Sequence, residues 1–272
     1  MNKPTIGICG LGYVGSAILH GFGLIADIRV YDINPILSQN TLQEVCQESE
    51  FIFISVPTPM IEETGEADIS IVNEIVDKCL KYVAYTDKIL IIKSTIPPLT
   101  TESLKTKYQD LNIIHNPEFL TARNSKLDFI NSSRIILGGD RELTNRVEQL
   151  YRKRFVATPI LHMDATTAEM VKYTSNCFFT VKLSYLNEIY QMCEKLGVEY
   201  EDVIKGVLLD QRIGNSHYEV PGHDGLKGWG GICFTKDLPA MIYKSKELGI
   251  ESTVMEATLK KNKEVRKNRD WD

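Results

Sequence analysis

Six short apolar runs, rich in β-branched residues, are spaced through the first half of this 272-residue chain. They are residues 5–9, 28–31, 51–56, 89–92, 112–115 and 134–137. Segments with helical periodicity separate the runs, and continuous apolar runs of this length are typical of strands buried on both faces. The alternation predicts an α/β fold whose N-terminal part is a Rossmann-like, doubly wound parallel sheet.

The first of these runs leads directly into a glycine-rich turn. Gly10, Gly12 and Gly15, with Tyr13 and Val14 between them, form a GxGxxG pattern that opens a helical segment. In this context the first glycine permits a tight turn, the second admits a pyrophosphate to the helix N-terminus, and the third lets the helix pack on the sheet. The pattern therefore predicts a dinucleotide site, and a glycine-rich turn without a ligand is the alternative.

Polar residues stand at the ends of three of the runs. Asp32 ends the second, 22 positions after Gly10, where a carboxylate accepts hydrogen bonds from a ribose 2′-hydroxyl and repels a 2′-phosphate. This predicts NAD as the cofactor in preference to NADP. Thr58 and Thr95 follow two other runs, at the strand ends where ligands of open α/β sheets bind, although the prolines beside them also fit a simple strand end.

The pattern changes near Leu161. Residues from about 164 to 196 form an amphipathic segment without proline or glycine, which predicts one long helix. A shorter helix (201–208), a loop rich in glycine and proline (214–231) and a helical remainder (235–269) are expected to follow. We therefore expect a nucleotide-binding domain over residues 1–160 and a central helical domain over residues 161–272.

A glycine-rich segment of the second half delivers Cys233 to the start of a helical pattern. It reads GWGGICFTKD, so Lys236 stands nearby and Asp237 lies one turn onward. A helix N-terminus and a lysine both favour the thiolate form of a cysteine. A buried structural cysteine is the alternative, but the glycines and charges around Cys233 favour a reactive thiol.

Two other segments place polar groups where they can serve a reaction. Lys172 and Asn176 are four residues apart in the long helix and so share a face, which lets an ammonium and an amide stabilise an oxyanion. Glu118 follows the strand at 112–115 and is suited to a general base. A solvent-exposed Lys172 and a solvated Glu118 are the alternatives.

The composition argues against several other classes of protein. The net charge is −5, with no basic patch of the kind that binds nucleic acid, and no apolar run is long enough to cross a bilayer. Six cysteines without a CxxC pair or a histidine cluster suggest neither a disulfide framework nor a metal site. The fold begins too early for a signal peptide, so a cytoplasmic location is expected.

Eight segments between Gly10 and Asp237 closely resemble, in order, the UDP-glucose/GDP-mannose dehydrogenase family: GLGYVG, VPTP, STIPP, NPEFL, EMVKYTSN, LNEI, DQRIG and GWGGICFTKD. Members of this family oxidise the C6 alcohol of a nucleotide sugar to a carboxylate in two NAD⁺-dependent steps without releasing the aldehyde. The resemblance implies UDP-glucose as the first substrate to consider and a role in polysaccharide biosynthesis. GDP-mannose and N-acetylated sugars stay open.

The resemblance also implies a role for individual residues. Cys233 matches the nucleophile that forms a thiohemiacetal and then a thioester. Lys172 and Asn176 match stabilisers of the oxyanions, and Glu118 matches the acid/base residue. The full set comprises the catalytic residues Cys233, Lys172, Asn176, Glu118, Asp237 and Thr95; the cofactor contacts Gly10, Gly12, Tyr13, Val14, Gly15, Asp32, Thr58, Thr95 and Lys236; and the substrate contacts Glu118, Phe119, Leu120, Lys172, Asn176, Arg212, Tyr218 and Gly230. Some members supply the matching arginine from a neighbouring subunit, and a homodimer built on the long helix is expected.

The sequence departs from the family pattern at several places. Ala122 stands where a second glutamate is common, Thr235 where a proline is frequent, and the loop at 221–227 is longer than in many members. The chain ends where typical members continue into a further α/β domain. One alternative is therefore a weak or inactive NAD-binding module that needs a partner chain to bind the nucleotide sugar. Another is a two-electron dehydrogenase of the 3-hydroxy acid type, which gives no reason for the GGxC segment.

Overall fold

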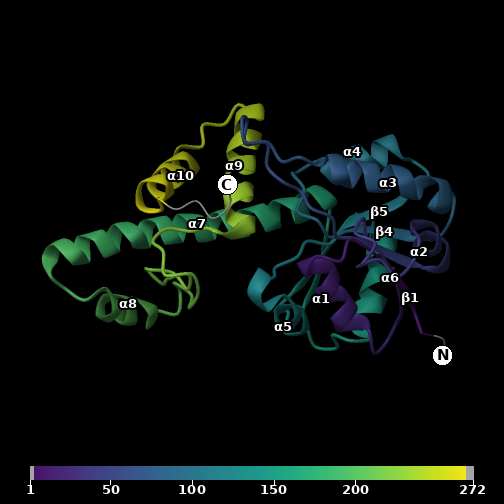
Figure 1. Cartoon of the computed structure of the whole chain (residues 1–272), viewed down its shortest axis with the longest axis horizontal. Helices are drawn as coiled ribbons and strands as arrows, with labels where there is room; N and C mark the ends of the chain where they lie inside the picture. The colour runs from purple at the N-terminus through teal and green to yellow at the C-terminus, as the bar shows by residue number, and fades with distance from the viewer. Residues whose placement is uncertain (1–2, 268–272) are drawn as a thin grey trace. The chain divides into compact units, whose positions relative to one another are not determined.

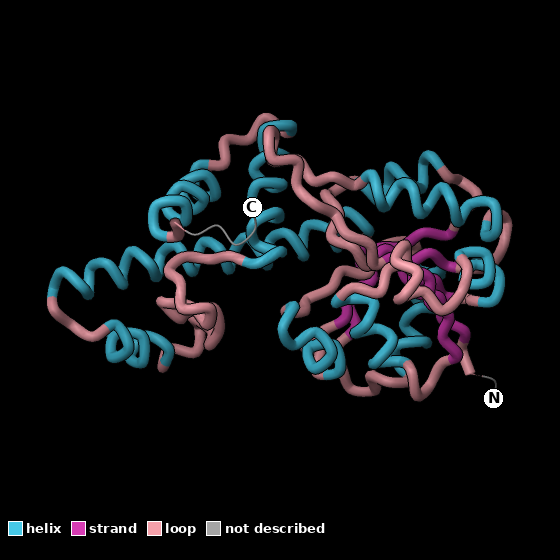
Figure 2. The backbone as a smooth tube through the Cα atoms, viewed as in Figure 1, coloured by secondary structure: helices cyan, strands magenta, loops and turns pink. Residues whose placement is uncertain are grey.

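The computed structural model describes residues 3–267 of the chain. The chain divides into two compact units, Met1–Pro59 with Asp68–Lys172, and Met60–Ala67 with Tyr173–Asp272. We call them the sheet unit and the helical unit. All strands of the described chain belong to the sheet unit (Figure 2). Helix α7 (Ala165–Leu196) begins in the sheet unit and continues into the helical unit.

A seven-stranded sheet forms the centre of the sheet unit. Its strands are β1 (Thr5–Cys9), β2 (Asp27–Tyr31), β3 (Phe51–Ile54), β4 (Ile89–Ile92), β5 (Asn112–His115), β6 (Ile135–Gly138) and β7 (Ile160–Met163). Their order across the sheet is β2-β1-β3-β4-β5-β6-β7, and β1 to β5 are parallel. The carboxyl ends of these five strands therefore meet at one edge, the edge at which open α/β sheets bind ligands.

The expectation of a wholly parallel sheet is wrong at its far side. β6 pairs antiparallel with β5 through His115 and Gly138, and β7 is parallel to β6. Only short helices, η1 (Ala122–Asn124) and α5 (Ser125–Ile130), connect β5 to β6, and the chain returns to the edge it left. The sequence did not indicate β7, because its half-exposed residues lack a continuous apolar run.

Helices cover both faces of the sheet (Figure 1). One face carries α1 (Tyr13–Phe22), α5 and α6 (Arg141–Arg152); the other carries α2 (Leu42–Glu48), α3 (Ser70–Val83) and α4 (Thr100–Lys107). Along β3, Phe51 and Phe53 join the first core, whereas Ile52 and Ile54 join the second. This alternation follows from the two-residue period of a strand, and it confirms the doubly wound α/β class.

The helical unit is built on the second part of α7. It contains α8 (Tyr200–Leu208), α9 (Gly231–Glu247) and α10 (Thr253–Val265), and the long helix expected over residues 164–196 is confirmed. The helical remainder expected over 235–269 is instead two helices. α9 starts earlier, at Gly231, and the chain turns at Gly249, whose φ of +70° favours glycine, before α10. Residues 268–269 lie outside the described part.

Candidate active site

The fingerprint turn has the geometry that a pyrophosphate requires. Gly10 has a φ of +94°, and a Cβ there would lie 2.6 Å from the carbonyl oxygen of Ser55. Gly12 is the N-cap of α1, and nothing lies within 4 Å of where its Cβ would be. The open N-terminus of α1 thus offers backbone N–H groups and the positive end of the helix dipole to a phosphate. Tyr13 is exposed, and Gly15 packs against Gly10.

Asp32 fastens this turn to the end of β2. Its Oδ2 accepts a hydrogen bond from the N–H of Leu11 at 2.6 Å, and its Oδ1 accepts from the N–H of Asn34 at 2.8 Å. The carboxylate is partly exposed, so its remaining lone pairs can accept a ribose hydroxyl. The residues present therefore fit NAD.

Two loops at the carboxyl ends of β3 and β4 are joined to each other. The hydroxyl of Ser94 donates to the carbonyl of Val56 at 2.7 Å. Thr58 and Thr95, the threonines expected to contact cofactor or substrate, are both buried in these loops. The Ser94 hydrogen bond therefore fixes the position of the loop after β4 relative to the loop after β3.

Glu118 and Lys172 form a buried ion pair. The Lys172 Nζ lies 2.7 Å from Glu118 Oε1, and the side chains are 3% and 8% exposed. Glu118 Oε2 also accepts from the N–H of Leu120 at 2.6 Å. Burial alone would raise the pKa of Glu118, but the ammonium of Lys172 and the Leu120 hydrogen bond hold it below the usual value. Glu118 is therefore ionised at neutral pH.

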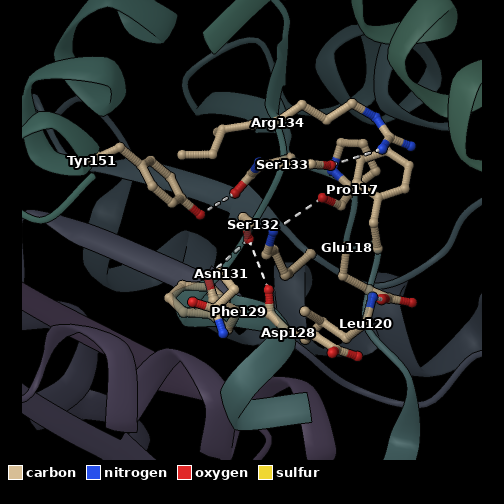
Figure 3. A pocket seen from close by; sticks show the side chains of 14 residues that line it. Pro117, Glu118, Leu120, Asp128, Phe129, Asn131, Ser132, Ser133, Arg134 and Tyr151 are labelled. Carbon is tan, nitrogen blue, oxygen red and sulfur yellow. Dashed lines mark hydrogen bonds between the residues drawn. The ribbon is translucent and has the colours of Figure 1, made fainter. Parts of the chain in front are cut away.

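A cavity of about 280 Å³ adjoins this pair in the sheet unit (Figure 3). Its lining includes Lys93, Glu118, Phe119, Arg134 and Tyr151. The Arg134 guanidinium lies 4.0 Å from the centroid of the Phe119 ring. The hollow thus combines an aromatic face, cations and a carboxylate.

Lys93 is a member of this group that the sequence reasoning missed. It directly follows β4, is buried, and donates from Nζ to the carbonyl of Pro117 at 3.0 Å. Burial lowers the pKa of Lys93 to about 7, and the charge of nearby Glu118 opposes that shift. The available signal was a lysine placed immediately after four apolar strand residues.

In the helical unit, Cys233 lies in the first turn of α9. Gly230 is the N-cap, and Gly231, the first helical residue, has a φ of +77°. Cys233 is partly exposed, whereas the other five cysteines are buried. The structure therefore places this thiol, partly exposed, beside the N-terminal N–H groups of α9.

A second polar cluster lies further along α9. Asn176 Nδ2 donates to Asp237 Oδ2 at 2.6 Å, and Lys236 Nζ lies 2.6 Å from Asp237 Oδ1. Asp237 is 1% exposed. The cluster binds together three of the residues singled out from the sequence.

The residues expected to contact the sugar from the loop after α8 have other partners. The Arg212 side chain is 90% exposed, and its guanidinium is paired with Asp210 at 2.5 Å. The carbonyl of Tyr218 accepts from the Tyr200 hydroxyl at 2.6 Å. The Arg212 guanidinium is thus held by Asp210 of its own loop, and the side chain remains exposed to solvent.

The described part of the chain contains neither grouped metal ligands nor a helix suited to span a membrane. Among residues 3–267, no three His, Cys, Asp or Glu side chains are grouped so that they could hold a metal ion. Within the same residues, no helix combines the length and the apolar character that crossing a bilayer requires.

Comparison with known proteins identifies the same two domain types in this chain. Residues 32–155 match the NAD binding domain of the UDP-glucose/GDP-mannose dehydrogenase family, and residues 166–264 match the central domain of the same family. The expectation of NAD is thereby confirmed. The two matches cover most of the chain and fall on strands β3 to β6 and on the helices α7 to α10.

Individual relatives extend this result. A UDP-glucose 6-dehydrogenase of Rickettsia felis is 34% identical over 247 residues, which is 87% of this chain and 52% of the relative. A UDP-glucose dehydrogenase structure from Pyrobaculum islandicum superposes with a TM-score of 0.87 at 28% identity, covering 97% of this chain and 68% of that one. The chain spans about half the length of the curated relatives it matches.

A more distant structure shares the fold alone. The 3-hydroxyisobutyrate dehydrogenase of Mycobacterium tuberculosis is 18% identical, with a TM-score of 0.76, over 95% of this chain and 92% of that one. The matches to both family domains and the ordered motifs distinguish between the two kinds of relative. This chain belongs to the UDP-glucose/GDP-mannose dehydrogenase family.

Proposed function

We propose that the chain catalyses the NAD-dependent oxidation of the C6 alcohol of a nucleotide sugar to a carboxylate, with UDP-glucose the first substrate to test. The observation that carries this proposal is Cys233 in the first turn of α9, four residues before Asp237 and its bonds to Asn176 and Lys236. A conventional two-electron alcohol dehydrogenase has no need of such a thiol. A thiol that binds the aldehyde covalently suits an enzyme that carries an alcohol to the acid level without releasing the intermediate.

In the proposed reaction, the alcohol, two NAD⁺ and one water give the carboxylate, two NADH and three protons. The Cys233 thiolate adds to the carbonyl carbon of the bound aldehyde, forming a C–S bond and an oxyanion. Loss of a hydride from that carbon gives a thioester, and attack of water breaks the C–S bond and returns the thiolate. Bound NAD⁺ supplies the hydride acceptor in both oxidations.

The other residues have separate tasks in this scheme. Glu118, kept ionised by Lys172, accepts protons. Lys172 and Asn176, one turn apart on α7, stabilise the oxyanions, and the second N–H of the Asn176 amide is available while the first bonds Asp237. Asp237 orients Lys236 and Asn176.

The test is NADH formation by the purified chain with NAD⁺ and a panel of UDP- and GDP-linked sugars. We expect about two NADH for each sugar consumed, and loss of turnover in Cys233→Ser with NAD⁺ affinity unchanged. A stoichiometry of one NADH, or full activity of the serine variant, would contradict the thioester route.

A second function is favoured by one observation. Ala122, at the position where the family commonly has a glutamate, lies exposed in η1. This fits an NAD-binding module that turns over weakly unless a partner chain supplies surface for the nucleotide. NAD⁺ binding without NADH formation across the panel would favour this function.

A homodimer through α7 is part of the proposal. Phe178, Tyr185 and Met192 recur every seven residues on α7, and they are 60%, 60% and 58% exposed. A heptad stripe of large apolar side chains is typical of a helix that packs against another helix. Sedimentation analysis is expected to give a dimer for the wild type and a monomer for Tyr185→Glu, with Tyr85→Glu as the control at an exposed tyrosine outside α7. The cytoplasmic location stays a prediction.

A further inference from the structure

The loop that delivers Cys233 is held by α10. Asn262 in α10 is 2% exposed and makes two hydrogen bonds to one residue of this loop. Its Nδ2 donates to the carbonyl of Trp229 at 2.9 Å, and its Oδ1 accepts from the N–H of Trp229 at 2.8 Å. The amide therefore pairs with the backbone immediately before the N-cap of α9, much as a neighbouring strand would.

Arg266, the residue that caps the C-terminus of α10, packs against the N-cap Gly230 itself. Its side chain is 1% exposed, and Nη2 lies 2.6 Å from Asp224 Oδ2. A Cβ at Gly230 would lie 2.4 Å from this Nη2, and a Cβ at Gly228 would lie 2.3 Å from Asn262 Oδ1. The two glycines are therefore required for close approach of the loop to α10, a reason that the sequence pattern does not reveal.

Side chains of α7 hold the same loop. The N–H of Gly228 donates to Asn187 Oδ1 at 2.9 Å, and Trp229 Nε1 donates to Ser184 Oγ at 2.9 Å. Asn187 and Trp229 are 1% and 3% exposed. Because the loop has no ladder or helix of its own before Gly231, these side chains fix where α9 begins.

We propose that Asn262 and Arg266 are positioning residues for the Cys233 thiol: by fixing Trp229 and Gly230, they set the N-terminal turn of α9 that carries the nucleophile. The inference rests on the proposed function only in taking Cys233 as the reacting group. The reactivity of a thiol at a helix N-terminus depends on the alignment of the first N–H groups. Asn262 in α10 and Arg266 at its C-cap determine that alignment from outside α9.

The experiment measures the rate at which iodoacetamide alkylates Cys233 in the full chain at neutral pH, by mass spectrometry of the Cys233 peptide. Asn262→Leu and Arg266→Met are expected to slow alkylation about two- to fivefold. Arg266→Lys, which keeps the charge opposite Asp224, is expected to recover part of the rate. Thr258→Val is the matched control, because it changes a buried polar side chain of α10 whose hydroxyl makes none of these loop contacts.

Alkylation that is unchanged or faster in both variants would overturn the proposal, since the two residues would then only cover the thiol. If Asn262→Leu fails to fold, Asp224→Asn provides the test, because its 32%-exposed side chain tolerates the change and releases Arg266. In an active chain, the same variants lower kcat and leave KM for the sugar unchanged. Iodoacetamide needs neither sugar nor NAD, so slowed alkylation in a chain that oxidises no sugar would contradict the proposed function and support this inference.

Discussion

The sheet unit and the helical unit hold their buried carboxylates by different means. In the sheet unit, Glu118 is bonded both to a side chain, Lys172, and to the backbone N–H of Leu120. In the helical unit, the bonds of Asp237 run to the side chains of Asn176 and Lys236. The first carboxylate is thus partly fixed by backbone that follows a paired strand, and the second depends on side chains from two helices.

The two clusters also differ in charge. Glu118 shares its surroundings with two buried lysines, Lys172 and Lys93, whereas Asp237 faces one lysine that is 18% exposed and one neutral amide. Removing one member of an ion pair therefore lowers the free energy of unfolding by different amounts in the two units. A buried charge that loses its counter-ion is far less stable than a charge that reaches water. The sheet unit is expected to be the less tolerant of substitution.

The largest expected effect tests this difference directly. Glu118→Leu leaves the buried Lys172 ammonium without this carboxylate, so the free energy of unfolding is expected to fall by about 3–5 kcal/mol. The double variant Glu118→Leu with Lys172→Met is expected to recover much of that loss. Urea unfolding of the four members of this cycle provides the measurement, and simple additivity of the two losses would contradict the coupling.

The corresponding change in the helical unit is expected to be smaller. Asp237→Asn keeps the volume and one acceptor oxygen but removes the charge, so the free energy of unfolding falls by about 1.5 kcal/mol. Lys236→Met, measured in the same urea titration, is the control for loss of the ion pair alone. A loss for Asp237→Asn equal to that for Glu118→Leu would remove the distinction between the two units.

The pH dependence of stability tests whether Lys93 loses its proton in the folded chain. Because burial lowers the pKa of Lys93 to about 7 in the folded chain, the unfolded chain binds more protons between that pH and the ordinary lysine value. Stability therefore rises with pH across this window, by at most about 1.4 kcal/mol per pH unit from this one group. Lys93→Met is expected to be relatively more stable at neutral pH and to show a flatter profile in urea unfolding from pH 7 upward. An unchanged slope would show that Lys93 keeps its proton when buried.

The smallest expected effect is on the NAD affinity of the sheet unit. Asp32→Asn keeps an oxygen that accepts from the N–H of Leu11 but loses the charge that favours the ribose hydroxyls. NAD affinity is expected to fall about fivefold, roughly 1 kcal/mol, and the preference over NADP to narrow. Fluorescence titration with both nucleotides measures this, and the urea midpoint reports separately the loss of the hydrogen bond from the N–H of Asn34.

Much of the fold was predictable because its signals are local. The apolar runs predict the strands, and the uninterrupted helical period predicts α7. The glycines from Gly10 to Gly15 predict the tight turn, in which Gly10 has a φ of +94°. The antiparallel β6 and the exposed β7 were not predictable, since pairing direction depends on where a connection returns and β7 lacks an apolar run. The break between α9 and α10 was marked only by Gly249.

The sequence by itself determined which chemistry is present: a fingerprint turn, an acid after the second strand, and a cysteine beside Lys236 and Asp237. Only the tertiary structure decided which groups are paired and which are buried. It joined Glu118 to Lys172 across 54 positions and Asn176 to Asp237 across 61, and it brought Lys93, Asn262 and Arg266 to these sites. The physical reason is that hydrogen bonding and desolvation depend on distance in space, which local periodicity does not encode.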